Sequence, residues 1–479
     1  MERLPAEVYS PSKLHTVYYP ILVKRAVGST ADPNNVVWRP EKTRVLYNIA
    51  GFTPDTTAAT YNSMIDKYGG NMNLPQQTAT GRFYTKKIGE RWWIVDPLGY
   101  LRYERSVTSF RKGGSARNAA AWNQRFGSDD KWCSTTAEEL AAIGFHGTGA
   151  FCTGTYRTIQ NYNAAHPDRP LTMCPSVNFI GTFKIEKNYP YPADGDNDDA
   201  DNLIGLVFYP GWEEWCKDYA RRIYADYKDD PNVMGVFSDN EIDFGSTNGT
   251  NPRLLDRFLK IKDDNDPAKK AALDFINSRG IDPKGEMDDF INSDFAGIVA
   301  EKYYSAVSAA IKEFDPGLMY LGSRLHGQPK YLPGIIEAAG KYCDIISINY
   351  YSRWSPELTT KISQWERYTD TPFMVTEFYT KGLLDNDLSN QSGAGFGVPT
   401  QKERAYAYQH FTLGLLEAQH CVGWQWFKYQ DDDFPDNSNM PCNKGVYDNA
   451  YNMYPYLGEY MKVLNFNAYS LIEWFDSKR

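Results

Sequence analysis

The 479-residue sequence lacks the features that mark several large classes of protein. Its seven cysteines are an odd number without a CxxC pair, so they predict neither a disulfide framework nor a zinc site. No apolar run reaches the roughly 18 residues that a membrane span needs. The net charge is −9 and no block of Lys and Arg could follow a phosphate backbone, so nucleic acid is not an expected partner.

Motifs of several other kinds of site are missing as well. There is no GxSxG nucleophile elbow and no HExxH zinc motif, and SGAGFG at 392–397 lacks the lysine of a P-loop, so we interpret it as a flexible loop. The acidic run at 194–201 begins like a calcium loop, but Asp199 stands where such a loop needs glycine and Gly205 where it needs glutamate. We therefore expect a solvated acidic loop, no metal and no cofactor.

The N-terminal part differs in composition from the rest of the chain. The first residues, MERLPAEVYSPSKLH, lack the apolar core of a signal peptide, which fits a cytosolic protein or one whose leader has been removed. Residues 1–85 are rich in Pro, Asn, Thr and Tyr and show little periodicity. We expect them to form a short β-rich appendage ahead of a catalytic domain at 86–479.

From there on, strand-like and helical segments alternate, which is typical of parallel βα units. Helical patterns include a stripe of apolar residues at every fourth position from 291 to 311. Eight such units predict an α/β fold, a (β/α)8 TIM barrel, with a doubly wound open sheet as the alternative. The eight predicted strands lie at 106–110, 145–151, 171–181, 232–238, 318–324, 344–351, 372–379 and 422–429.

Two glutamates stand at strand ends, where a barrel of this kind carries its active site. Glu241 closes VFSDNE after the fourth strand, and Glu377 lies near the end of the seventh. A retaining glycosidase needs one carboxylic acid to protonate the leaving oxygen and one carboxylate to attack the anomeric carbon. A single Asn-Glu pair at a loop is more often only a solvated turn. Two glutamates at the corresponding ends of two barrel strands favour catalysis instead.

Neighbouring strand ends add candidate sugar-binding residues. Asn240 could bond the hydroxyl beside the anomeric carbon, a contact that strengthens in the transition state. Tyr350 could donate to Glu377 or simply pack at the rim. Trp424 and Trp426 share one face of a strand, as a sugar platform or as core. Asp239 has no assigned role, and further candidates for sugar contacts are Arg324, His326, Asn349 and Lys428.

Four segments carry a resemblance to a known family, and they are RWWIVDPLGYLRYERSV, GVFSDNE, PFMVTEFYTKG and SGAGFGVPTQKERAYAYQHFTLGLLEAQHCVGWQWFKYQDDD. With these segments the sequence resembles glycoside hydrolase family 50, the β-agarase group, over about residues 85–445. That family belongs to a clan of retaining barrel glycosidases whose acid/base glutamate follows an asparagine on strand four and whose nucleophile ends strand seven. The resemblance implies that Glu241 is the acid/base and Glu377 the nucleophile. It also implies cleavage of β-1,4 galactosidic bonds in agarose, often in an exo manner that releases neoagarobiose.

Two features depart from the family pattern. Many members carry an N-terminal β-sandwich, whereas about 80 residues precede GRFYTKK here, which is short for a complete sandwich of roughly 100 residues. The first strand segment, RYERSVTSF, carries Arg102, Glu104 and Arg105 where a more apolar run is expected.

The leading hypothesis is a retaining hydrolase of a red-algal galactan, in the first place a β-agarase, and the resemblance implies a secreted or periplasmic enzyme. A β-galactosidase or a hydrolase of porphyran or another galactan is the alternative within the hydrolases. A non-catalytic carbohydrate-binding barrel is the alternative from another class, although binding alone would not require both glutamates.

Overall fold

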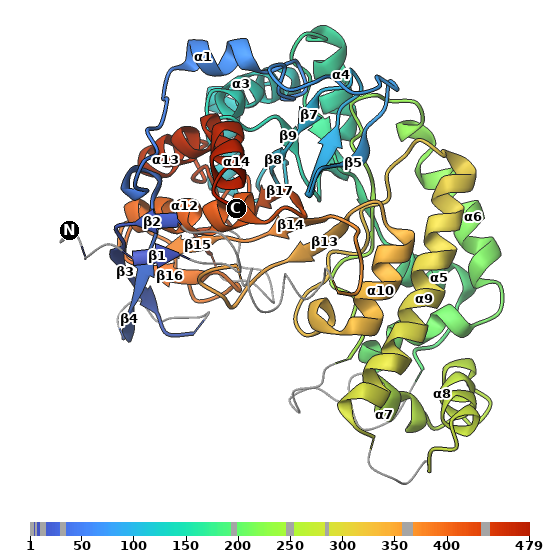
Figure 1. The fold of residues 1–479 in the computed structure, drawn as a ribbon. Helices are drawn as coiled ribbons and strands as arrows, with labels where there is room; N and C mark the ends of the chain where they lie inside the picture. Colours follow the sequence, from blue (N-terminus) through green and yellow to red (C-terminus); the bar gives the residue numbers. More distant parts are fainter. Residues whose placement is uncertain are drawn as a thin grey trace. The chain divides into compact units, whose positions relative to one another are not determined.

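A computed structural model describes residues 4, 7–9, 16–28, 35–192, 199–245, 253–282, 287–356, 367–432 and 441–479 (Figure 1). The chain forms two compact units. Unit 1 contains Met1–Pro175, Tyr350–Ile362 and Met374–Arg479, and unit 2 contains Ser176–Asn349 and Ser363–Phe373. The division predicted at residue 85 stays a prediction.

The N-terminal part of unit 1 consists of small antiparallel sheets. In β3, Ile21 and Val23 are buried and Leu22 between them is exposed, so one face of this strand packs on a hydrophobic core. The predicted turn at 96–99 connects two antiparallel strands, and the Asp96 carboxylate closes it by accepting backbone N–H groups. The elements are β1 (Glu7–Tyr9), β2 (Thr16–Tyr18), β3 (Ile21–Ala26), β4 (Trp38–Thr43), η1 (Leu46–Asn48), α1 (Ala58–Met64), β5 (Tyr84–Ile88), β6 (Arg91–Val95) and β7 (Leu101–Arg102).

Five barrel strands of unit 1 are hydrogen-bonded in the order β10-β9-β8-β17-β14. Gly423 in β17 has a φ of 153°, and a Cβ there would lie 2.4 Å from the Cβ of Glu104, so glycine permits the close approach of β17 to β8. The strands are β8 (Glu104–Val107), β9 (Gly147–Thr148), β10 (Thr172–Met173), β14 (Phe373–Glu377) and β17 (Cys421–Trp426). The remaining elements of the unit are α2 (Ala116–Arg125), α3 (Asp129–Ala141), η2 (Thr153–Thr155), α4 (Tyr156–Ala165), β15 (Thr380–Gly382), β16 (Phe396–Val398), α12 (Gln401–Glu417), α13 (Pro455–Phe466) and α14 (Ala468–Asp476).

The charged residues at the end of β7 and the start of β8 are buried with ionic or polar partners. Arg102 forms an ion pair of 2.5 Å with Glu104, and both side chains are at most 1% exposed. Arg105 donates to the backbone oxygen of Gly144 and, at 3.1 Å, to the hydroxyl of Tyr61. Buried charges are tolerated when they are paired and hydrogen-bonded, so this segment forms a strand without the expected apolar run.

Unit 2 contains the middle strands of the chain. β11 pairs in parallel with β12, Val236 bridges in parallel to Tyr320, and Leu325 bridges to Ile348 of β13. The predicted helical stripe is confirmed, because its positions from 295 to 311 are buried in α9. The elements are β11 (Ser176–Val177), α5 (Ile180–Lys187), η3 (Asp199–Phe208), α6 (Trp212–Ile223), η4 (Ala225–Tyr227), β12 (Phe237–Ser238), α7 (Leu254–Leu259), α8 (Pro267–Ser278), α9 (Asp289–Phe314), η5 (Pro329–Tyr331), α10 (Pro333–Tyr342) and β13 (Ile346–Asn349).

Parallel strands alternate with helices in both units, which confirms the predicted α/β class. The predicted third strand was too long, because its last two residues, 180 and 181, begin α5. The predicted fifth strand, 318–324, forms a single bridge at Tyr320, and a second bridge follows it at Leu325. Most of the acidic run at 194–201 and the predicted helical residues 357–366 lie outside the described residues.

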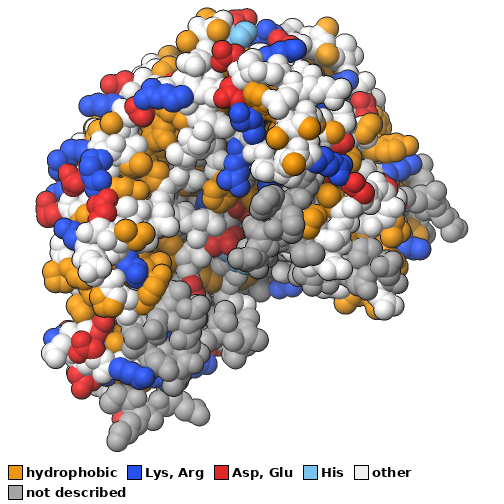
Figure 2. Space-filling model, turned by 180° about the vertical axis from the view of Figure 1, so that it is seen from behind, with side chains coloured by type: hydrophobic (Ala, Val, Ile, Leu, Met, Phe, Trp, Pro, Cys, Tyr) orange, Lys and Arg blue, Asp and Glu red, His pale blue; other side chains and the backbone are white. Residues whose placement is uncertain are grey.

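The surface carries mixed charge. Figure 2 shows Lys and Arg side chains interspersed with Asp and Glu over one face of the molecule. No helix within the described ranges combines the length and the apolar character that a membrane crossing demands.

Candidate active site

Glu241 lies just beyond β12 on a turn with unusual backbone angles. Asp239 and Glu241 have φ values of 49° and 55°, in the left-handed region that non-glycine residues rarely adopt. The turn is held in place because the N–H of Glu241 donates to the oxygen of Ser323 at 3.1 Å. Such strained positions are concentrated at functional sites, where the surrounding structure supports them.

Predicted sugar-binding residues of unit 2 surround this glutamate. Asn349, the last residue of β13, donates from Nδ2 to Oε1 of Glu241 at 2.8 Å. Nδ1 of His326 lies 3.9 Å from Oε2, and the Glu241 side chain is 31% exposed. Asn240 accepts from Nε of Arg324 at 2.9 Å and from Asn349 at 3.3 Å. The structure therefore brings all four predicted residues to Glu241, and solvent still reaches its carboxyl group.

Asp239, which had no assigned role, stabilises this turn through hydrogen bonds of its side chain. Its Oδ1 accepts the N–H of Ile180 at the start of α5, and its Oδ2 accepts the hydroxyl of Tyr303 at 2.7 Å. Burial raises the pKa of Asp239 to about 6, although the Tyr303 hydroxyl lowers it in part. Asp239 is therefore a structural anchor between β12, α5 and α9.

Glu377 has a different setting in unit 1. It is the last residue of β14 and is only 5% exposed. Its Oε2 accepts the hydroxyl of Tyr351 at 2.7 Å, and its backbone oxygen accepts the N–H of Tyr350 at 2.8 Å. The hydroxyl at this carboxyl group thus belongs to the residue after the predicted Tyr350. A buried carboxylate with a fixed donor on one oxygen keeps its other oxygen directed at one position.

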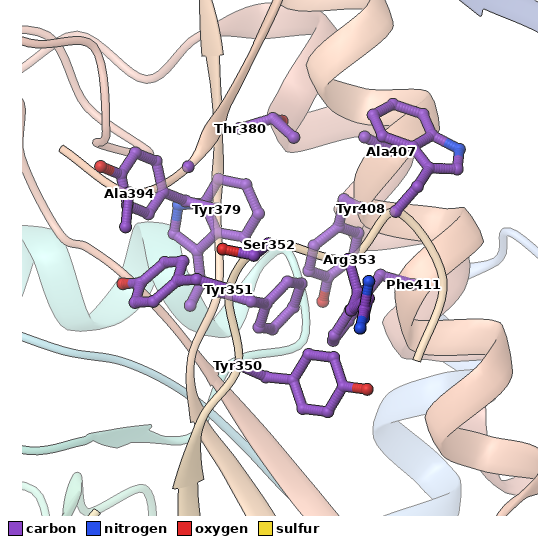
Figure 3. Close-up of a pocket in the computed structure, with 14 residues that line it drawn as sticks. Tyr350, Tyr351, Ser352, Arg353, Tyr379, Thr380, Ala394, Ala407, Tyr408 and Phe411 are labelled. Carbon is purple, nitrogen blue, oxygen red and sulfur yellow. The ribbon is translucent and has the colours of Figure 1, made fainter. Parts of the chain in front are cut away.

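Tyr351 also lines a pocket of unit 1 (Figure 3). Residues 350–354 line it together with Tyr408 and Phe411 of α12, and the ring centroids of Tyr350 and Phe411 are 5.5 Å apart. Flat aromatic faces with polar edges suit sugar rings as well as they suit a core. The aromatic residues that line the pocket are Tyr350, Tyr351, Trp354, Phe378, Tyr379, Tyr408, Phe411 and Trp426.

The other predicted residues of the eighth strand are largely buried. Trp424 is fully buried and donates from Nε1 to the Tyr408 hydroxyl at 3.0 Å. Trp426 is 1% exposed, lines the pocket of Figure 3 and donates to the oxygen of Lys444. Lys428 forms an ion pair with Asp432. A direct contact of these three side chains with sugar stays a prediction.

The predicted glycine-rich loop is anchored at several points. Lys381 donates from Nζ to the backbone oxygens of Asn390, Ser392 and Gly393, at 3.2, 2.8 and 3.4 Å. The end of the loop forms β16, which pairs in parallel with β15. An ammonium group on three carbonyl oxygens holds this loop beside Tyr379.

Sequence reasoning assigned no role in the site to two residues, Tyr351 and Tyr303. Tyr351 directly follows the predicted Tyr350, but the sequence alone does not show which of the two adjacent rings points to Glu377. Tyr303, which holds Asp239, is visible in the sequence only as one member of the core stripe of α9. In the described part of the chain, no group of three or more His, Cys, Asp or Glu side chains is placed to hold a metal ion.

Several solved structures are similar to this chain. No protein-family model matches the sequence. The crystal structure of BpGH50 has a TM-score of 0.91 and 45% identity, and the match covers 99% of this chain and 100% of that one. A structure described as an exo-beta-agarase has a TM-score of 0.67 and 17% identity over 91% of this chain and 75% of that one. These neighbours confirm the predicted (β/α)8 barrel.

Curated sequences point to the same group of proteins. Beta-agarase B of Vibrio sp. strain JT0107 is 24% identical over 442 residues, which cover 76% of this chain and 45% of that protein. Beta-agarase A of the same organism is 23% identical over 237 residues, covering 42% of this chain and 23% of that protein. The chain therefore spans less than half the length of the curated relatives it matches.

Proposed function

Because this chain belongs to glycoside hydrolase family 50, we propose that it is a retaining glycoside hydrolase that cleaves β-galactosidic bonds in a red-algal galactan, as a β-agarase. Glu377 is the nucleophile and Glu241 the general acid and base. The observation that carries this proposal is the contrast between a solvent-accessible glutamate on a strained turn and a buried glutamate fixed by a tyrosine hydroxyl.

The reaction proceeds in two displacements. Glu241 protonates the glycosidic oxygen while a carboxylate oxygen of Glu377 bonds to the anomeric carbon. The bond between this carbon and the glycosidic oxygen breaks, the leaving sugar departs as an alcohol, and a covalent glycosyl-enzyme results. Glu241 then takes a proton from water, and this water cleaves the ester with net retention. Retention requires the two carboxyl groups to be about 5–5.5 Å apart.

The neighbours of Glu241 support its part in this reaction. The Asn349 amide holds Oε1, which leaves Oε2 to exchange the proton. The Asn240 amide is held at its oxygen by Arg324 and Asn349, so its NH₂ group is oriented and can donate to a sugar hydroxyl. A donor that is oriented before the substrate arrives costs little reorganisation in the transition state.

The favoured mode is exo cleavage that releases neoagarobiose. A polymeric substrate favours action outside the cytoplasm, in the periplasm or the medium. A β-galactosidase or a hydrolase of porphyran remains the second candidate within the hydrolases.

Product analysis tests the proposal. The purified full chain is incubated with agarose, porphyran and an aryl β-galactoside, and the products are separated by chromatography over time. A single disaccharide that accumulates from agarose from the first minutes supports exo β-agarase action, and a ladder of oligosaccharides indicates endo action. Proton NMR of the first product reports the anomeric configuration, and an inverted product would refute the two-step mechanism. Binding of oligosaccharide without release of reducing ends would support the non-catalytic barrel instead.

A further inference from the structure

Two lysines of unit 1 converge on one aspartate beyond the end of β17. Lys428 and Lys444 both form ion pairs with Asp432, and the Lys444 Nζ lies 2.8 Å from Oδ2. The three side chains, here called the lysine cluster, are 12%, 7% and 23% exposed in the order Lys428, Lys444, Asp432. Their backbone is fixed, because the N–H of Lys428 donates to the oxygen of Lys444 and Val446 donates back to Lys428.

The cluster carries an excess of positive charge. Two ammonium groups face one carboxylate, and the pKa of Asp432, which burial alone would raise, lies below its usual value because of Lys428 and Lys444. Burial lowers the pKa of Lys428, with further lowering by Lys444 and by the exposed Arg111, while Asp432 opposes it. A partly buried site with more positive than negative groups stabilises an incoming anion.

This excess lies beyond the end of β17, the strand next to that of Glu377. β17 neighbours β14 in the sheet order, and the N–H of Phe427 donates to the oxygen of Phe378 at 3.2 Å. The Lys444 Nζ is 5.9 Å from the ring centroid of Tyr379, and that ring lies 5.7 Å from the ring of Tyr351, which holds Glu377. Within unit 1, two aromatic rings therefore separate the cluster from Glu377.

We propose that the lysine cluster is a subsite for an anionic substituent of the galactan, a sulfate ester or a carboxylate. This inference rests on the proposed function. Among the described residues, the two ammonium groups share the carboxylate of Asp432, and an anionic substituent would add a second counter-charge that a neutral sugar does not bring. Lysine ammonium groups act as point charges with several donors, so they accept either anion. The substrate class is then a charged red-algal galactan as well as neutral agarose.

The test compares three oligosaccharides of equal length, one neutral, one with sulfate esters and one with carboxylate substituents. The readout is the ratio of kcat/KM for each charged substrate to that for the neutral one. For the wild-type chain, this ratio should exceed one for at least one anion and fall with added salt, because salt screens the attraction. Lys444→Met should lower the ratio at least fivefold, and Asp432→Asn should raise it. Inorganic sulfate should inhibit the wild-type enzyme competitively and the Lys444→Met enzyme more weakly.

Lys112→Met is the matched control. Lys112 is a half-exposed lysine of the same unit whose Nζ pairs with Asp129 at 2.7 Å, and its loss should leave the ratio unchanged. Equal losses of kcat/KM on neutral and charged substrates in the Lys444→Met and Asp432→Asn enzymes would overturn the inference. The cluster would then bind hydroxyl groups or only support the fold. A wild-type enzyme that cleaves neutral galactan without preferring an anion also overturns it and leaves the proposed function standing. A wild-type enzyme that cleaves no galactan overturns both.

Discussion

The two glutamates are held in opposite ways. Glu241 stands on a turn with left-handed residues, is contacted by an amide and an imidazole, and has a side chain that is 31% exposed. Glu377 ends a regular strand, is 5% exposed and accepts a tyrosine hydroxyl. A group that exchanges protons needs access to solvent, whereas a nucleophile needs a fixed oxygen. The contrast between the two settings supports the different roles proposed for the two glutamates, which the residue type alone does not distinguish.

Removal of the nucleophile should have the largest effect. We expect Glu377→Ala to lower kcat on agarose by a factor on the order of 10⁴ or more, because no covalent intermediate can form. Added azide should restore part of the turnover with an activated aryl β-galactoside. Reducing-end release measures the loss, and circular dichroism checks that the variant is folded. Activity near that of the wild type would show that Glu377 is not the nucleophile.

Removal of the acid should be more selective. Glu241→Ala should slow the cleavage of agarose by a factor on the order of 10²–10⁴, because its leaving oxygen needs a proton. An aryl β-galactoside with a good leaving group needs no proton, so its first step should slow far less. Steady-state kinetics on agarose and on the aryl β-galactoside measure the two losses of rate. Equal losses on the two would remove the distinction between the glutamates.

Tyr351→Phe tests whether the fixed oxygen matters. We expect a drop in kcat of about 10- to 100-fold with a smaller change in KM, because a hydrogen bond to a charged group is lost. Tyr162→Phe is the control, since its hydroxyl donates to the oxygen of Arg169, away from Glu377. If both variants kept full kcat, the tyrosine would serve only in packing.

Asp239→Asn should affect stability more than catalysis. The pKa of Asp239 is raised from 3.8 to about 6, so its contribution to stability is complete below pH 3.8 and is lost as the pH rises through about 6. Over this pH interval the free energy of unfolding of the wild-type chain should therefore fall by on the order of 2–3 kcal/mol. That of the variant should not show this fall. Thermal melting of both proteins across this pH range measures the difference. Parallel curves would contradict the assigned pKa direction.

Much of the fold and part of the site follow from local sequence. The apolar-to-acidic change in VFSDNE marks where a strand leaves the core, and the four-residue stripe of α9 marks a buried helix face. The expectation of a more apolar first strand was wrong. Its charged residues are buried because they find partners far away in the chain, such as Tyr61, which lies 44 positions from Arg105. The hydrogen bond of Tyr351 to Glu377 was not predicted for a related reason. The direction of adjacent rings beyond a strand depends on the local turn.

The sequence by itself determined the order of strands and helices, the polar strand ends and the two glutamates. These features are local, since periodicity and turn residues act over a few neighbours. Only the tertiary structure decided which side chains form hydrogen bonds and ion pairs with one another. Asn349 reaches Glu241 across 108 positions, Tyr351 reaches Glu377 across 26, and Lys428 and Lys444 meet at Asp432. A hydrogen bond depends on a separation of about 3 Å between atoms, and the three-dimensional packing of strands sets that separation.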